Sequence, residues 1–144
     1  MKRSRSVTIL SDVRVLIDTD ILLDVALERE PFVRASRQVL DWAQADPRQA
    51  AVAWHSLSNI FYLTGPSSRE FIRDLVRFVE VAPTGTKEAH QALGFPMPDF
   101  EDALQAAAAL AFDALFVVTR NTRDYKGSPV PAISPARFIK ELGR

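Results

Sequence analysis

The segment from Pro98 to Tyr125 constrains the fold of this chain more than any other. It reads PDFEDALQAAAALAFDALFVVTRNTRDY. From Phe100 to Ala111 almost every residue is apolar or alanine, which is typical of a helix buried over most of its surface. The run LFVVT follows Asp113 and is rich in β-branched residues, as expected of a strand covered on both faces. A buried helix followed by a buried strand is half of a βαβ unit, which predicts a parallel sheet.

Acidic residues gather at the start of this helix. In a βαβ unit the helix runs antiparallel to the strands, so its first turn, with Asp99, Glu101 and Asp102, lies near the edge where the strands end. The strand at residues 115–119 leaves the sheet at the same edge and enters a polar segment that contains Arg120, Asn121 and Asp124. Open α/β sheets bind ligands outside the carboxyl ends of their strands. The sequence therefore predicts a functional site at this edge.

The rest of the chain alternates short strands with helices. Strands are predicted at residues 13–17, 50–53, 80–82, 115–119 and 132–134, and helices at residues 21–30, 32–43, 54–63, 67–79, 86–93, 100–111 and 135–142. In the helix at residues 54–63 we expect the core side to carry Trp54, Leu57, Ile60 and Phe61. This alternation predicts a three-layer αβα fold with a mainly parallel central sheet.

Composition limits the remaining classes. The 144 residues fit a single domain, predicted at residues 13–144, preceded by a flexible extension at residues 1–12. Cysteine is absent, which excludes thiolate chemistry and suits a reducing compartment. Lys and Arg number 18, equal to Asp and Glu, so overall charge attracts neither nucleic acid nor membrane. No apolar run approaches the ~20 residues of a membrane span, and we expect a cytoplasmic protein.

Three acids, Asp18, Asp102 and Asp124, are expected to meet at the predicted site. Asp18 directly follows the apolar strand VRVLI and precedes a helix. Carboxylates that are brought together repel one another unless a positive charge lies among them. A hard divalent cation such as Mg²⁺ is the simplest candidate, because it takes oxygen ligands and is often held by a few carboxylates and a substrate phosphate. Hydrolysis of a phosphodiester is the leading reaction class.

The strand ending in LID at Asp18, the helix start DFEDALQAAAAL and the exit VVTRNTRDY together resemble the PIN-domain nucleases, and in particular the bacterial toxin branch of toxin–antitoxin pairs. The resemblance covers residues 13–142. It implies a ribonuclease that depends on Mg²⁺ or Mn²⁺, built on a parallel sheet, often a homodimer and often inhibited by an antitoxin protein.

The resemblance also assigns roles. Asp18 matches the first metal-binding acid of the family and Asp102 matches the acid that opens the buried helix. Asp124 or Asn121 takes the place of the last acid, and Thr119 resembles the hydroxyl residue at the strand end.

One position departs from the family pattern. PIN nucleases commonly carry Glu on the helix after the second strand, and the best match here is Asn59, which brings no negative charge. Asp99 or Glu101 could supply the missing charge, so Asp99 joins the candidate metal ligands. Arg120 and Arg123 border the site and are the candidates for binding a substrate phosphate.

Other interpretations stay open at this point. Asp18, Asp20 and Asp99 all lie where helix-capping residues are common, and Asp124 could be a turn residue. The DTDI sequence that begins at Asp18 also resembles haloacid-dehalogenase-type phosphatases, in which the first Asp is a nucleophile. Finally, Asn59 is compatible with a PIN-like binding module that grips RNA or a protein without cutting.

Overall fold

The computed structural model describes residues 13–143, so the extension predicted at residues 1–12 lies outside the described part of the chain. Within that part, five parallel strands form one sheet in the order β3-β2-β1-β4-β5. The strands are β1 (Val15–Ile17), β2 (Ala50–Val52), β3 (Glu80–Val81), β4 (Phe116–Val118) and β5 (Ala132–Ile133). Every predicted strand is present, and the prediction of a parallel sheet is confirmed.

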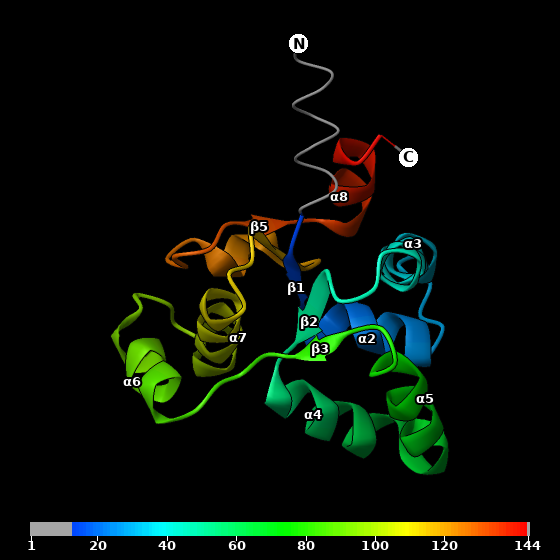
Figure 1. Ribbon diagram of the computed structural model, residues 1–144, viewed down its shortest axis with the longest axis horizontal. Coiled ribbons are helices and arrows are strands. Elements are labelled where there is room, and N and C mark those ends of the chain that lie inside the picture. The colour runs from blue at the N-terminus through cyan, green and yellow to red at the C-terminus, as the bar shows by residue number, and fades with distance from the viewer. Residues whose placement is uncertain (1–12, 144) are drawn as a thin grey trace.

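Helices cover both faces of the sheet. They are α2 (Thr19–Ala26), α3 (Val33–Ala45), α4 (Trp54–Thr64), α5 (Ser68–Leu75), α6 (Thr86–Gly94), α7 (Phe100–Ala111) and α8 (Pro135–Glu141), with short 3-10 helices η1 (Gly65–Ser67) and η2 (Thr122–Tyr125). In Figure 1, α6 and α7 lie on one side of the strands, and α2, α3, α5 and α8 lie on the other. The predicted three-layer αβα architecture is confirmed.

The alternation of side chains along the strands divides the core in two. Val15 and Ile17 of β1 point into the cluster shared with α2, α3 and α8, whereas Leu16 points into the cluster shared with α7. All three side chains are 0% exposed. Alanine makes up six of the twelve residues of α7, and these small side chains let the helix lie close to the sheet. The result fixes the first turn of α7 beside the end of β1.

The predicted core side of α4 is partly wrong. Ile60 is fully buried as expected, but Trp54 is 70% exposed and Phe61 is 43% exposed. Hydrophobic periodicity indicates which residues share a face, but the neighbouring elements decide how much of that face is covered. Here the buried contacts of α4 are made by Ser56 and Ile60, and the aromatic side chains remain at the surface.

Among the described residues, no helix is both long and apolar enough to cross a membrane.

Candidate metal-binding active site

Asp18 lies at the carboxyl end of the central strand β1, where it also caps α2. Its Oδ1 accepts a hydrogen bond from the backbone N–H of Thr19 at 2.6 Å, and its Oδ2 accepts one from the hydroxyl of Tyr125 at 2.9 Å. The side chain is buried. Burial raises the pKa of Asp18 above its usual range, partly opposed by these hydrogen bonds. Asp18 therefore combines the capping role with a place at the predicted site.

Asp20 lies in the first turn of α2 and binds the segment that leaves β4. Its Oδ2 accepts hydrogen bonds from the backbone N–H of Arg120 and from Nδ2 of Asn121, both at 3.1 Å, and from the hydroxyl of Thr119 at 3.3 Å. Its Oδ1 is buried and has no partner. Burial, followed by the charge of Asp18, raises the pKa of Asp20 to about 7. An unpartnered buried carboxylate oxygen is costly, and a cation would satisfy it.

Asp102 faces Asp18 across a cleft of about 440 Å³. Burial, followed by the charges of Asp99, Asp18 and Asp124, raises the pKa of Asp102 to about 7. Asn59 and Glu101 line the same cleft, and Nδ2 of Asn59 donates to Oε2 of Glu101 at 3.4 Å. The carboxylate of Glu101 thus lies next to the position where the family resemblance expects an acid.

The other predicted acids lie at the margin of this cleft. Oδ1 of Asp99 accepts hydrogen bonds from the backbone N–H groups of Glu101 and Asp102, so Asp99 is the N-cap of α7. Asp124 is exposed on η2 and does not line the cleft, although its charge acts on Asp102. Arg123 is exposed on the same short helix.

Arg120 is held by a buried carboxylate that the sequence did not single out. Nε of Arg120 donates to Oδ2 of Asp24 at 2.7 Å and its Nη2 donates to Oδ1 at 3.2 Å. The guanidinium also stacks on the ring of Phe32, 3.8 Å from its centroid. Arg29 binds the same Asp24 at 3.1 Å, and both arginines line the cleft. The cleft therefore has an acidic wall and a cationic wall.

The residues present fit a hard divalent cation. Among residues 13–143, no group of three or more His, Cys, Asp or Glu side chains is placed so that it could hold a metal ion by itself. Mg²⁺, however, is usually bound by one or two carboxylates, with water and substrate oxygens completing its shell. Asp18 and Asp102 supply oxygens only, and burial is the main reason that their pKa values are raised, an effect that a bound cation would oppose. Oδ1 of Asp20 is a further buried oxygen without a hydrogen-bond partner.

The sequence analysis did not identify four polar residues that help to build the cleft. They are Asp20, which anchors the segment after β4, and Asp24, Gln105 and Tyr125. The signal for Asp24 is its place four residues after Asp20 within an otherwise apolar helix, which puts both carboxylates on one helix face. Gln105 offered a similar signal, because it is the only strongly polar residue in the middle of the alanine-rich segment. It is 1% exposed.

A protein-family model described as PIN domain matches residues 14–123, which is more than half of the chain. The chain therefore belongs to the PIN domain family, and the predicted family is confirmed at that level. No curated protein matches the sequence.

Solved structures that resemble the chain have the same fold. A toxin–antitoxin complex from Klebsiella pneumoniae matches with a TM-score of 0.64 and 22% identity, covering 84% of this chain and 97% of that chain. VapBC2 from Rickettsia felis, bound to a DNA fragment from its promoter, matches with a TM-score of 0.64 and 15% identity over 83% and 98% of the two chains. FitAcB from Neisseria gonorrhoeae matches with a TM-score of 0.58 and 13% identity over 85% and 98%.

Proposed function

We propose that this chain is a divalent-metal-dependent ribonuclease and the toxin of a toxin–antitoxin pair. The observation that carries the proposal is the meeting of Asp18 and Asp102 in one cleft, although they are 84 positions apart in the sequence. The charge of Asp18 makes the carboxyl group of Asp102 harder to ionise. Membership in the PIN family and the likeness to solved toxin–antitoxin complexes support the same function.

In this proposal Asp18 and Asp102 hold Mg²⁺ or Mn²⁺, with Asp124 approaching from η2. Asp99 contributes its charge from the cap of α7. When bound, the cation supplies a water of lowered pKa and neutralises charge that develops on the phosphate. Asp20 holds the β4 exit, including Thr119 and Asn121, against the cleft.

The cationic wall would orient the substrate. Arg120 and Arg29 keep donors beyond those used on Asp24, because a guanidinium has five N–H groups. Fixed by a buried carboxylate, they can bind a phosphate with little loss of side-chain entropy. Arg123 is exposed near the same edge and would contact the nucleic acid backbone outside the cleft.

Incubation of the purified chain with an RNA pool and Mn²⁺ tests the activity. We expect cleavage that leaves 3′-hydroxyl and 5′-phosphate ends, is abolished by chelation and falls at least 100-fold in Asp102→Asn. Asp113→Asn is a matched control, because it makes the same chemical change at the other end of α7, where Asp113 has a positive φ that Asn tolerates. Metal-independent cleavage that yields a cyclic phosphate would contradict the proposal.

A PIN-like binding module is the second candidate, and Asn59 is the observation that favours it. An amide beside Glu101 leaves the cleft with one carboxylate fewer than the family resemblance expects. Calorimetric titration with Mn²⁺ separates the two functions: the nuclease requires binding that Asp18→Asn with Asp102→Asn removes. The phosphatase interpretation is not retained, since the chain belongs to the PIN family.

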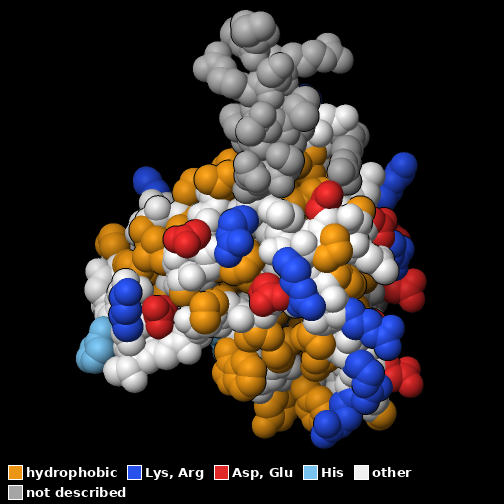
Figure 2. Space-filling model, in the orientation of Figure 1, with side chains coloured by type: hydrophobic (Ala, Val, Ile, Leu, Met, Phe, Trp, Pro, Cys, Tyr) orange, Lys and Arg blue, Asp and Glu red, His pale blue; other side chains and the backbone are white. Residues whose placement is uncertain are grey.

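The surface over α4 and α5 supports an antitoxin partner. Figure 2 shows apolar side chains gathered over α4, with Lys and Arg side chains beside them over α5. A groove of about 590 Å³ there includes Phe61, Tyr62, Arg69 and Arg73, and Arg69 stacks on the ring of Phe61. Exposed aromatic side chains beside arginines suit an apolar protein segment that carries acidic residues. We propose that this groove binds such a segment of the antitoxin.

A further inference from the structure

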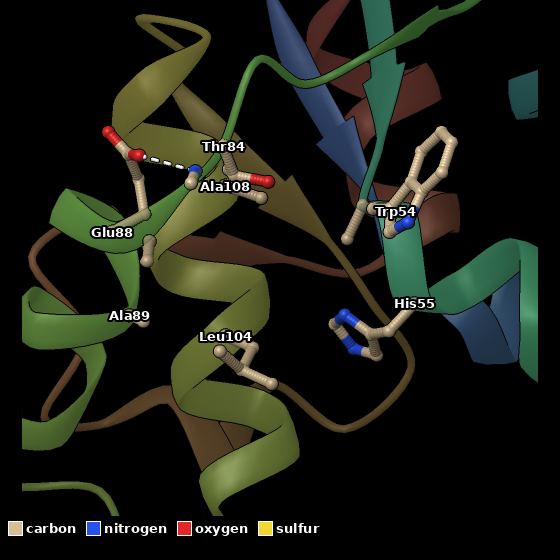
Figure 3. Close-up of a pocket in the computed structure, with 10 residues that line it drawn as sticks. Trp54, His55, Thr84, Glu88, Ala89, Leu104 and Ala108 are labelled. Carbon is tan, nitrogen blue, oxygen red and sulfur yellow. Dashed lines mark hydrogen bonds between the residues drawn. The ribbon is translucent and has the colours of Figure 1, made fainter.

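A second cavity lies beside the acidic cleft and has no part in the function proposed so far. It has a volume of about 200 Å³ and opens where β2 and β3 end. Figure 3 shows Trp54 and His55 of α4 on one side, Glu88 and Ala89 of α6 on the other, and Leu104 and Ala108 of α7 between them. Thr84 lies at the top of the view, in the segment between β3 and α6.

The walls of this cavity suit a flat, uncharged ring. Small apolar side chains form its floor, namely Ala53, Ala107 and Ala108. No Lys or Arg lines it, and one carboxylate, that of Glu88, does, so an anionic group would not be stabilised there. A volume of about 200 Å³ is below the ~300 Å³ at which pockets for drug-sized ligands begin, which leaves room for a single ring system.

Two side chains offer specific contacts. Trp54 lines the cavity at its rim and is 70% exposed, and Figure 3 shows its ring extending outwards, away from Leu104 and Ala108. His55 is half-buried, and its Nε2 lies 3.3 Å from Nε2 of Gln105. Burial lowers the pKa of His55, with Glu101 and Asp18 acting in the opposite direction. A neutral imidazole can both donate and accept hydrogen bonds, as the edges of nucleobases also do.

No residue lines both the cavity and the acidic cleft, but a buried hydrogen-bonded side chain links them. Gln105 connects them, since its Nε2 also donates to the hydroxyl of Thr19 at 3.0 Å, and Thr19 lines the cleft. On α4, His55 of the cavity is one helical turn, or ~6 Å along the axis, from Asn59 of the cleft.

We propose that this cavity binds one base of the RNA substrate, next to the phosphate held in the acidic cleft, with Trp54 as the stacking surface and His55 as the hydrogen-bonding group. Single-stranded RNA is recognised in this way, by bases that stack on aromatic side chains and bond through their edges. The inference rests on the proposed ribonuclease function and adds to it a residue set that selects the base.

The first test measures binding without cleavage. The chain has two tryptophans, and Trp42 is 2% exposed, so its indole N–H signal in an NMR spectrum is an internal reference. We expect at least one of AMP, GMP, CMP and UMP to shift the Trp54 indole signal, and ribose 5-phosphate not to do so. Ala89→Leu should weaken the shift by filling the cavity, whereas Ala45→Leu, at an exposed position at the end of α3, should not. An unshifted Trp54 signal with all four nucleotides, or an equal shift with ribose 5-phosphate, would overturn the inference.

The second test uses RNA cleavage in the presence of Mn²⁺. In Trp54→Ala, the fold-increase in KM should be about ten times the fold-decrease in kcat, because stacking contributes to binding of the base. The base preference around the cut should also change. Leu93→Ala, which also truncates an exposed apolar residue, is the control. His55→Ala should change the base preference without abolishing cleavage.

The two tests separate the inference from the function on which it rests. If no RNA is cut but nucleotides shift Trp54, the ribonuclease proposal fails and the base site stands. If RNA is cut while Trp54 is unshifted and its alanine variant is normal, the base site fails alone. If neither cleavage nor a shift is seen, both are wrong.

Discussion

At the scale of single residues, Asp24 is the side chain on which the cationic wall of the cleft depends. It is 0% exposed and accepts hydrogen bonds from Arg29, Arg120 and the hydroxyl of Ser36, the last at 2.9 Å. A buried carboxylate is tolerated only when it is paired in this way. The backbone N–H of Arg120 also donates to Asp20. By fixing Arg120, the carboxylate of Asp24 therefore also helps to hold Asp20 in the acidic wall. Asp24 thus positions residues of the site without lining the cleft.

We expect Asp24→Asn to lower the free energy of unfolding by about 2 kcal/mol, because it leaves two guanidinium groups without their counter-charge. Urea denaturation measures this change. Asp41→Asn is the control, since Asp41 is exposed on α3. Wild-type stability in Asp24→Asn would show that solvent, rather than Asp24, neutralises the arginines. RNA cleavage should also fall, because Arg120 would no longer be fixed.

At the scale of elements, η2 ends in Tyr125, which donates to Asp18, and the segment after it packs against another loop. Gly127 lies in this segment, close to the loop that leads into α7. A Cβ placed on Gly127 would overlap the backbone carbonyl of Pro96. The two loops therefore pack backbone to backbone, and this contact couples η2 to the start of the acidic helix.

Gly127→Ala should destabilise the fold by about 1–3 kcal/mol, because a methyl group has no space against a backbone carbonyl and the loops must separate. Thermal unfolding followed by circular dichroism measures the effect. Gly94→Ala is a suitable control, since a Cβ there meets nothing within 4 Å. An unchanged melting temperature in Gly127→Ala would mean that the loops can separate at no cost.

At the scale of the whole molecule, the fold partly buries neighbouring carboxylates at one edge of its sheet. Asp20 and Asp102 have pKa values of about 7 in the folded chain, against an ordinary value of 3.8. The folded state therefore binds protons more tightly than the unfolded state between these values. The stability that these two groups contribute is present at low pH and is lost as pH rises towards about 7.

We expect the chelator-treated protein to lose stability from this source as pH rises from about 5 to 8, and Asp102→Asn to lose less. His55 acts with the opposite sign, because its lowered pKa costs stability as pH falls, but it is present in both proteins and cancels in their difference. Melting temperatures measured across this pH range test the prediction. Equal pH slopes for the two proteins would contradict it. Mn²⁺ should reduce the slope of the wild type, since a cation neutralises the same carboxylates.

The sequence by itself determined the architecture and the edge at which the acidic cleft forms. Apolar runs of strand length and the alanine-rich helix leave little choice of layers, and chain direction alone brings Asp18 and Asp102 to the same end of the sheet. The sequence does not show which carboxylate oxygens of these acids already accept hydrogen bonds.

Only the tertiary structure decided the partners of the side chains. Asp99 caps α7, and Arg120 pairs with Asp24. Oδ1 of Asp20 has no hydrogen-bond partner, and Trp54 is exposed beside a cavity. The physical reason is that periodicity and chain direction act along one element, whereas hydrogen bonds and burial depend on side chains from several elements meeting to within about 3 Å.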